Sequence, residues 1–353
     1  MEGFKAFLKR KNIEISAKRY GIDALGAMAQ GLFCSLLIGT IIKTLGQQLS
    51  IQYLIDIGAY AMSVSGPAMS VAIGYALKAD PMVLFSLAAV GWAANAEGGA
   101  GGPLAVLIIA IIAAECGKMV SKETKVDILV TPGVTILIGV ALAKLIAPPI
   151  GTVASAFGLV IDNATKLQPF WMGIAVSVLV GIALTLPISS AAICSVLGLT
   201  GLAGGAAVAG CCAQMVGFAV MSFKENRWGG LFAQGIGTSM LQMGNIVRNP
   251  KIWLPPTLAS AITGPMATCL FHMEMNGAAV ASGMGTCGFV GQIGVYTGWV
   301  QDVASGAKAA ITPMDWIGMI LICFVLPAVL TCVIAIPFRK KGWIGENDLK
   351  LDL

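Results

Sequence analysis

The sequence predicts an all-α polytopic membrane protein. Of its 353 residues, 57% are hydrophobic and 11% are charged, whereas a soluble domain carries about 25% charged residues. Several separate apolar segments reach the roughly 20 residues that a helix needs to cross a bilayer. Runs such as PLAVLIIAIIAAECG are apolar on every face, which excludes the alternating strands of a membrane barrel. These segments predict about ten crossings, joined by short arms.

The first twenty residues, MEGFKAFLKRKNIEISAKRY, predict a basic amphipathic helix on the cytoplasmic face of the membrane. Lysines and arginines alternate there with apolar side chains, and their positive charge keeps this end of the chain in the cytoplasm. The apolar run that follows, residues 24–45, is too long for a signal peptide and is the first predicted span.

The central region, residues 21–338, alternates long spans with short glycine-broken pieces. The long apolar segments are residues 24–45, 51–77, 104–117, 128–146, 170–199 (interrupted at Pro187), 202–223, 253–271, 277–300 and 316–337. Late in one of them, Glu115 is one helical turn from Lys118, and we expect an ion pair at the membrane edge.

Two shorter pieces predict broken helices or re-entrant hairpins. Residues 82–94 are too few to cross as an ordinary helix, and residues 229–244 lie between two cation-bearing ends that both look cytoplasmic. The lysine-rich loop at residues 118–127 and the tail at residues 339–353 are also expected in the cytoplasm, because positive charge accumulates on that side.

The chain also contains a candidate internal repeat, with halves at about residues 51–147 and 168–271. EGGAGGPLAVLI at residues 97–108 aligns with TGLAGGAAVAGC at residues 200–211. Repeated halves with interrupted helices at matching places are the usual pointer to a transporter's binding site. The alternative is that small-residue segments resemble one another by composition alone.

Polar side chains gather near four of the predicted breaks. Ionisable groups at membrane depth are costly, so they usually face a cavity or a partner. The four groups are Asn95 with Glu97; Gln234, Thr238, Gln242 and Asn245; His272, Glu274 and Asn276; and Thr286 with Gln292. Glu97 and Glu274 are the strongest single candidates.

A carboxylate, the only imidazole of the chain and several amides could hydrogen-bond a small polar solute. His272 and Glu274 could instead relay a proton, since imidazole titrates near neutral pH. The competing interpretation is that HMEMNG is a water-exposed loop at the membrane face.

The composition favours no catalytic or metal chemistry. One histidine cannot supply a nucleophile and base set, and the nine cysteines show neither metal-ligand spacing nor a disulfide framework. The net charge of +5 lies at the ends and in short loops, so it concerns topology and not nucleic acid. We expect no catalytic residue, no metal ligand and no cofactor.

Two segments carry a family resemblance: GGAGGPLAVLIIAIIAAECGKMVSKETKVDILVTPGVTI and LPPTLASAITGPMATCLFHMEMNGAAVASGMGTCGFVGQIG. Together they resemble the membrane IIC-like subunits of the sugar phosphotransferase system, in the branch of perfringolysin-regulator-like proteins. The resemblance covers nearly all of the chain from about residue 21 to residue 337.

The resemblance implies a homodimeric permease of the bacterial inner membrane, with re-entrant hairpins whose tips bind the solute through a glutamate, a histidine and amides. Glu97, His272 and Glu274 occupy plausible places for this. Family members rely on soluble IIA and IIB partners for phosphorylation, and neither tail here is long enough to hold a IIB domain, so the phosphorylation coupling is open.

Three functions compete. The broken helices and intramembrane acids favour a permease for a small polar solute, such as a carbohydrate, working by alternating access with a site at broken-helix tips. The alternative is a membrane-embedded sensor or regulator without transport. A membrane enzyme is the weakest, because no nucleophile and base set is found.

Overall fold

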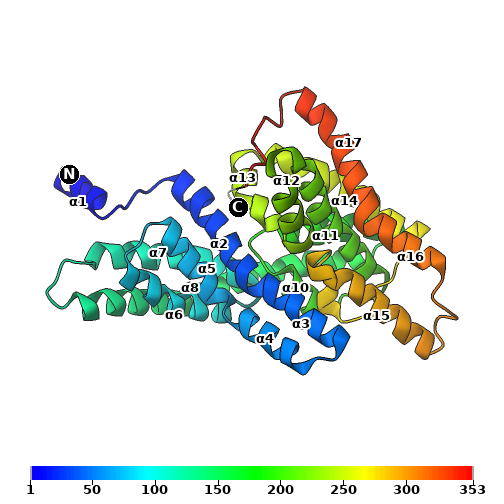
Figure 1. Cartoon of the computed structure of the whole chain (residues 1–353), viewed down its shortest axis with the longest axis horizontal. Coiled ribbons are helices and arrows are strands. Elements are labelled where there is room, and N and C mark those ends of the chain that lie inside the picture. The colour runs from blue at the N-terminus through cyan, green and yellow to red at the C-terminus, as the bar shows by residue number, and fades with distance from the viewer. Residues whose placement is uncertain (1, 352–353) are drawn as a thin grey trace. The chain divides into compact units, whose positions relative to one another are not determined.

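The computed structural model describes residues 2–351, with side chains from residue 6 onward. Helices make up 82% of the chain, and the described part contains one isolated β-bridge and no strand. The all-α class is confirmed. The chain divides into two compact units, Met1–Ala154 and Ser155–Leu353, and each is described by itself (Figure 1).

Unit 1 opens with α1 (Glu2–Arg10), so the helix predicted for residues 1–20 ends halfway. Whether α1 lies on a membrane face stays a prediction. The remaining elements are a continuous helix over Arg19–Leu49 that contains α2 (Ala24–Leu32) and α3 (Ile38–Leu49), then α4 (Gln52–Ser63), α5 (Ser65–Ala76), α6 (Pro81–Gly98), α7 (Gly102–Val120) and the first part of α8 (Asp127–Thr165), whose last residues belong to unit 2. Within this unit α2 packs on α5, α3 on α4, and α5 on α6.

Helices α6 and α7 form a helical hairpin. They pack on each other around the turn Gly99–Gly101, where Gly99 has a φ of +49° that favours glycine. Pro103 then stands in the first turn of α7, where its missing N–H costs nothing. Helix α6 is longer than the expected arm at residues 82–94, because Asn95 and Glu97 continue it past the apolar run.

The expected ion pair on α7 is confirmed. Lys118 Nζ lies 2.8 Å from Glu115 Oε2, one turn away, and the Lys118 side chain is only 2% exposed. Its ammonium group also donates to the backbone carbonyls of Asn12 and Leu77, at 2.9 Å each. Lys118 therefore fastens the chain before the first span to the end of α5.

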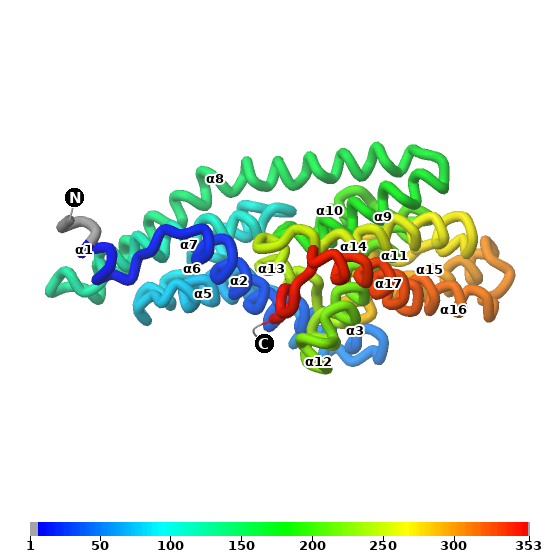
Figure 2. Tube along the Cα trace, turned by 90° about the horizontal axis from the view of Figure 1, so that it is seen from above, coloured from blue at the N-terminus to red at the C-terminus, as the bar shows by residue number. Residues whose placement is uncertain are grey.

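Helix α8 corrects the expectation of a span ending near residue 146. It is one helix of 39 residues that passes through Pro132, Pro148 and Pro149 (Figure 2). A proline in a helix removes one hydrogen bond, but in apolar surroundings an open loop would leave many more backbone groups without partners. The helix therefore continues.

Unit 2 is built around α11 (Gly201–Met221). In the most apolar 18-residue stretch of this helix, 89% is buried inside the protein. Helices α9 (Pro169–Thr185), α14 (Leu254–Pro265) and α17 (Leu326–Lys340) pack against it. The other elements are α10 (Ser190–Val196), α12 (Phe223–Phe232), η4 (Ala233–Gly237), η5 (Ser239–Gln242), α13 (Met243–Arg248), η6 (Pro250–Trp253), η7 (Met266–Leu270), η8 (Ala279–Gly283), η9 (Cys287–Phe289), α15 (Val290–Ala304), α16 (Pro313–Ile320) and η10 (Leu321–Val325).

Glycines bring helices into backbone contact in both units. A Cβ atom on Gly66 of α5 would lie 2.3 Å from the carbonyl oxygen of Gly91 in α6. In unit 2, a Cβ atom on Gly264 of α14 would lie 2.1 Å from the carbonyl oxygen of Gly173 in α9. Small residues are the usual means of close helix packing in membranes, and they explain much of the glycine content.

Five helical stretches among the described residues are long and apolar enough to cross a membrane, or six if the bent pair α4 and α5 is one span. They are Arg19–Leu49, Pro81–Val120, Asp127–Thr165, Gly201–Met221 and Pro313–Lys340, of which the second turns back at Gly99. The count of ten crossings and the internal repeat stay predictions. The expected interruption at Pro187 is confirmed, since α9 ends at Thr185 and α10 begins at Ser190.

Candidate functional site

The HMEMNG stretch is an extended segment, not a helix. It follows η7, and Met275 forms an antiparallel bridge with Gly201 at the start of α11. The Gly201 amide donates to the Met275 carbonyl at 3.1 Å, and the Met275 amide donates to the Gly201 carbonyl at 3.0 Å. The pairing fixes this segment against the N-terminus of the most buried helix of unit 2.

Side chains along this segment alternate in burial, as they do in a strand. Met273 and Met275 are buried in the core, whereas His272 is exposed and Glu274 and Asn276 are half-buried. His272 has a φ of +44°, in the left-handed region that often terminates a helix, and it directs the chain out of η7. The polar side chains therefore share the face opposite the core.

Glycines on both sides hold the segment at backbone distance. A Cβ atom on Gly205 of α11 would lie 1.7 Å from the Met273 carbonyl oxygen, and one on Gly298 of α15 would lie 2.7 Å from the Asn276 nitrogen. No side chain fits at either place without displacement. These two glycines thus let the HMEMNG segment lie in backbone contact with α11 and α15.

Asn276 is the centre of a polar cluster on this face. Its Nδ2 donates to Glu274 Oε2 at 3.0 Å and to Asp302 Oδ2 at 2.9 Å, and its Oδ1 accepts from the Gly201 amide at 3.1 Å. Two carboxylates thus converge on one amide. Asp302, on α15, was missed by the sequence analysis, although an acid at the end of an apolar run is the signal that singled out Glu97.

The amides Gln242 and Asn245 belong to a second, buried cluster. Gln242 Nε2 donates to Gln234 Oε1 at 2.8 Å, and Asn245 Nδ2 donates to Gln242 Oε1 at 2.8 Å. The same two nitrogens also donate to backbone carbonyls of the C-terminal tail, to Leu349 at 3.0 Å and to Lys350 at 2.9 Å. In this structure, therefore, backbone carbonyls of the tail accept hydrogen bonds from both of these side-chain amides.

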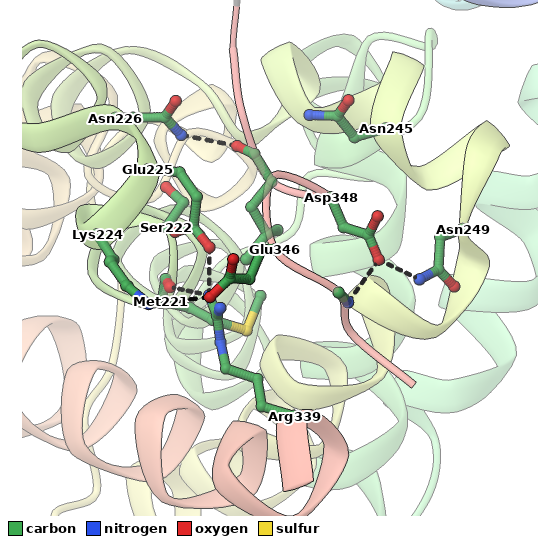
Figure 3. A network of polar contacts seen from close by, with 12 residues as sticks. Met221, Ser222, Lys224, Glu225, Asn226, Asn245, Asn249, Arg339, Glu346 and Asp348 are labelled. Carbon is green, nitrogen blue, oxygen red and sulfur yellow. Dashed lines mark hydrogen bonds and ion pairs between the residues drawn. The ribbon is translucent and has the colours of Figure 1, made fainter. Parts of the chain in front are cut away.

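Further contacts hold the tail in place (Figure 3). Asn226 Nδ2 donates to the Leu349 carbonyl at 2.7 Å, and Asn249 Nδ2 donates to Asp348 Oδ2 at 2.8 Å. The Leu349 side chain is fully buried. Where the tail leaves α17, Arg339 pairs with Glu225 at 2.9 Å.

Three other candidates belong to neither cluster. Gln292, at the start of α15, donates to Cys212 Sγ at 3.2 Å, and its buried Oε1 has no partner in the described part of the chain. Asn95 and Glu97 belong to α6 of unit 1, where Asn95 is half-buried and the exposed Glu97 lies 3.5 Å from Lys144 Nζ. The structure thus brings Glu274 together with Asn276, and Gln242 with Asn245.

No group of three histidine, cysteine, aspartate or glutamate side chains is placed to hold a metal ion among residues 2–351. The Glu274 cluster can form hydrogen bonds, since its two carboxylates and one amide are only half-buried.

The family model described as "Phosphotransferase system, EIIC" matches residues 22–351. The chain belongs to the phosphotransferase system EIIC family. It is therefore an integral membrane component of a sugar permease, and EIIC components work with IIA and IIB phosphotransfer proteins. The predicted resemblance is confirmed. Neither the search of curated proteins nor the search of solved structures found a match.

Within this EIIC chain, the matched region includes both polar clusters, the α6–α7 hairpin and the docked tail. The family assignment therefore applies to the whole arrangement described above.

Proposed function

We propose that this EIIC chain carries a small polar solute, a carbohydrate or a related metabolite, across the bacterial inner membrane by alternating access. The observation that supports this is the cluster in which Glu274 and Asn276, on an extended segment between interrupted helices, meet Asp302 of α15. Helix breaks of this kind are where membrane transporters bind their substrates.

The chemistry of this cluster suits a polyhydroxyl compound. Carboxylates accept hydrogen bonds from sugar hydroxyls, and an amide both donates and accepts. In this structure Asn276 Nδ2 is shared between two carboxylates that have further lone pairs available. His272, exposed at the start of the same polar face, would add a donor or an acceptor.

The other candidate residues would make additional contacts with the solute. Gln242 and Asn245 would reach a solute only after the tail leaves them, and Gln292 has one amide oxygen still without a partner. Asn95 and Glu97, on α6 of unit 1, stay candidates for binding the solute. We also propose a homodimer that works with separate IIA and IIB proteins.

A ligand sensor is the alternative, and one observation favours it. The tail at residues 345–351 is bound to buried amides, as expected of a segment that is released or docked in response to a signal. The two functions differ in outcome, because a sensor binds its ligand without moving it across the membrane.

The test is the thermal stability of the purified protein in detergent against a panel of sugars. A ligand at a hundredfold excess over Kd stabilises the folded state by about 2.7 kcal/mol. We expect one sugar to stabilise the wild type and the control Glu14→Gln, whose side chain is exposed, but not Glu274→Gln or Asp302→Asn. An equal shift in all four proteins would place the site elsewhere.

Uptake then separates the two functions. The stabilising sugar, radiolabelled, should enter vesicles that contain the protein and its IIA and IIB partners. Binding without uptake under those conditions would favour the sensor.

A further inference from the structure

A cation-rich pocket lies in unit 1, far along the chain from the Glu274 cluster. Its volume is about 420 Å³. Five cations line it, contributed by three separate parts of the chain: Arg10, Lys11, Lys78, Lys118 and Lys122. The parts are the end of α1 with the residue that follows it, the turn between α5 and α6, and the last turn of α7 with the loop that follows it.

Hydrogen bonds fix these three parts to one another. Lys118 Nζ donates to the Asn12 carbonyl and so joins the third part to the first. Ser121 Oγ donates to Asp80 Oδ2 at 3.0 Å, which joins the third part to the second. Lys11 Nζ donates to the Ser121 carbonyl. The pocket is therefore built by tertiary contacts.

Lys118 acts in holding the pocket together and not in binding. It is almost fully buried, it forms an ion pair with Glu115, and it donates to two backbone carbonyls. The cations that remain to meet a ligand are Arg10, Lys11, Lys78 and Lys122. All four belong to segments whose backbones the contacts above hold in place.

Positive charge is in excess here. Glu123 pairs with both Arg10 and Lys11, and Asp80 pairs with Lys122 at 2.5 Å. The Lys78 side chain is exposed and makes no hydrogen bond or ion pair with the described residues, while its backbone amide donates to the Tyr75 carbonyl at 2.9 Å. Five cations against Glu115, Asp80 and Glu123 leave two positive charges unmatched, which is close to the charge of about −2 on a phosphate monoester.

The backbone conformation of two of these lysines also supports a ligand site here. Lys78 has a φ of 54° and Lys122 a φ of 61°, in a region that residues other than glycine seldom occupy. Such outliers persist where surrounding structure imposes them, and they gather at ligand sites. Here both flank Asp80, the carboxylate that an incoming anion would displace.

We propose that this pocket binds a phosphate group, carried either by a free phosphate compound or by the headgroup of an anionic phospholipid. The anion would take Lys78 as a new partner and compete with Asp80 and Glu123 for Lys122, Arg10 and Lys11. Basic pockets beside transmembrane helices recognise lipid headgroups by the same chemistry.

The experiment uses the full chain purified in a non-ionic detergent. Thermal stability is measured against inorganic phosphate, with chloride at the same ionic strength as reference, and separately against short-chain phosphatidylglycerol, with phosphatidylcholine as reference. Stabilisation by phosphate identifies a free phosphate compound as a source of the ligand. Stabilisation by phosphatidylglycerol alone identifies a lipid headgroup.

Three variants locate the effect. Lys78→Gln should weaken binding of the active probe about tenfold, since one charge-assisted hydrogen bond is lost. Lys125→Gln, an exposed lysine of the same loop that does not line the pocket, should bind like the wild type. Glu123→Gln should bind more tightly, because it frees Arg10 and Lys11.

Two results would overturn the proposal. One is a wild type whose stability responds to neither phosphate nor phosphatidylglycerol. The other is equal binding by Lys78→Gln and Lys125→Gln, which would mean that the probe meets general surface charge. The gain expected of Glu123→Gln keeps the test decisive even if Lys78→Gln folds poorly.

Discussion

Gln242 Nε2 donates a hydrogen bond to the backbone carbonyl of Leu349, 3.0 Å away and 107 residues later in the chain. The same nitrogen donates to Gln234 Oε1, and the side-chain oxygen Oε1 of Gln242 accepts from Asn245 Nδ2. One buried amide thus joins the tail to two other side chains, and its whole hydrogen-bonding capacity on the nitrogen is used.

Gln242→Leu should destabilise the protein through the partners that it leaves behind. Gln234 Oε1 and Asn245 Nδ2 would each lose a buried hydrogen bond, at about 1–3 kcal/mol for each group left unsatisfied. Chemical denaturation in detergent measures the loss, and hydrogen exchange should show the tail amides becoming less protected. Gln47→Leu, at an exposed position on α3, is the matched control and should change neither. A stable variant with a protected tail would contradict this account.

Gly205→Ala should disturb the Glu274 cluster without touching a polar side chain. The new methyl group would lie 1.7 Å from the Met273 carbonyl oxygen, so the extended segment has to move. We expect a lower melting temperature and loss of sugar uptake. Gly26→Ala is the control, since a Cβ there meets open space and alanine is the better helix former in α2. Equal uptake by both variants would show that the seating of the segment does not matter.

Lys118→Met should be costly because it leaves the Glu115 carboxylate, 12% exposed, without its ion-pair partner. Breaking a buried pair in this way costs about 3–5 kcal/mol. The control is Lys166→Met, which breaks an exposed pair with Asp162 on α8, worth about 0–1 kcal/mol. Denaturation of both variants gives the comparison. In addition, Glu115→Gln should recover part of the loss in the Lys118→Met background, and a further loss there would argue against the pair.

Acid should weaken the contact between Asp80 and Lys122. The hydrogen bond from Lys122 Nζ lowers the pKa of the Asp80 carboxyl below its ordinary value. A lowered pKa means that the contact stabilises the fold above the ordinary aspartate pKa, and that this stability is lost as the pH falls through the lowered one. Wild type should therefore be slightly more stable than Asp80→Asn at pH 7.

The difference in melting temperature should begin to shrink below a pH of about 3.9, the ordinary pKa of aspartate. It should be small throughout, because Lys122 is 71% exposed and solvent screens the pair. A difference that stays constant down to the acid limit would assign it to something other than the charge on Asp80.

Composition and periodicity were enough to predict the class of fold, because an apolar run of this length has few stable structures other than a membrane-crossing helix. The positions of α9, α11 and the helical stretch Pro313–Lys340 follow from such runs, and the break after α9 follows from Pro187. The length of α8 did not follow, because a proline pair normally ends a helix, and only the cost of open backbone in apolar surroundings overrides that rule.

The polar groups could be found in the sequence, but their partners could not. His272, Glu274 and Asn276 stand at alternate positions, and that pattern is visible in HMEMNG. The bridge to Gly201 depends on backbone atoms of a distant segment, which leave no side-chain signal. The same is true of the tail, where Gln242 and Asn245 bind the carbonyls of Leu349 and Lys350 and not their side chains.

The glycine contacts have a consequence at the level of the gene. Any change in the first two bases of a glycine codon either encodes a residue with a side chain or creates a stop codon. At Gly66, Gly205 and Gly264 an added Cβ atom would lie within 2.6 Å of a carbonyl oxygen, whereas at Gly26 and Gly133 it meets open space. In related genes, the codons for Gly66, Gly205 and Gly264 should therefore stay almost unchanged. The codons for Gly26 and Gly133 should vary freely.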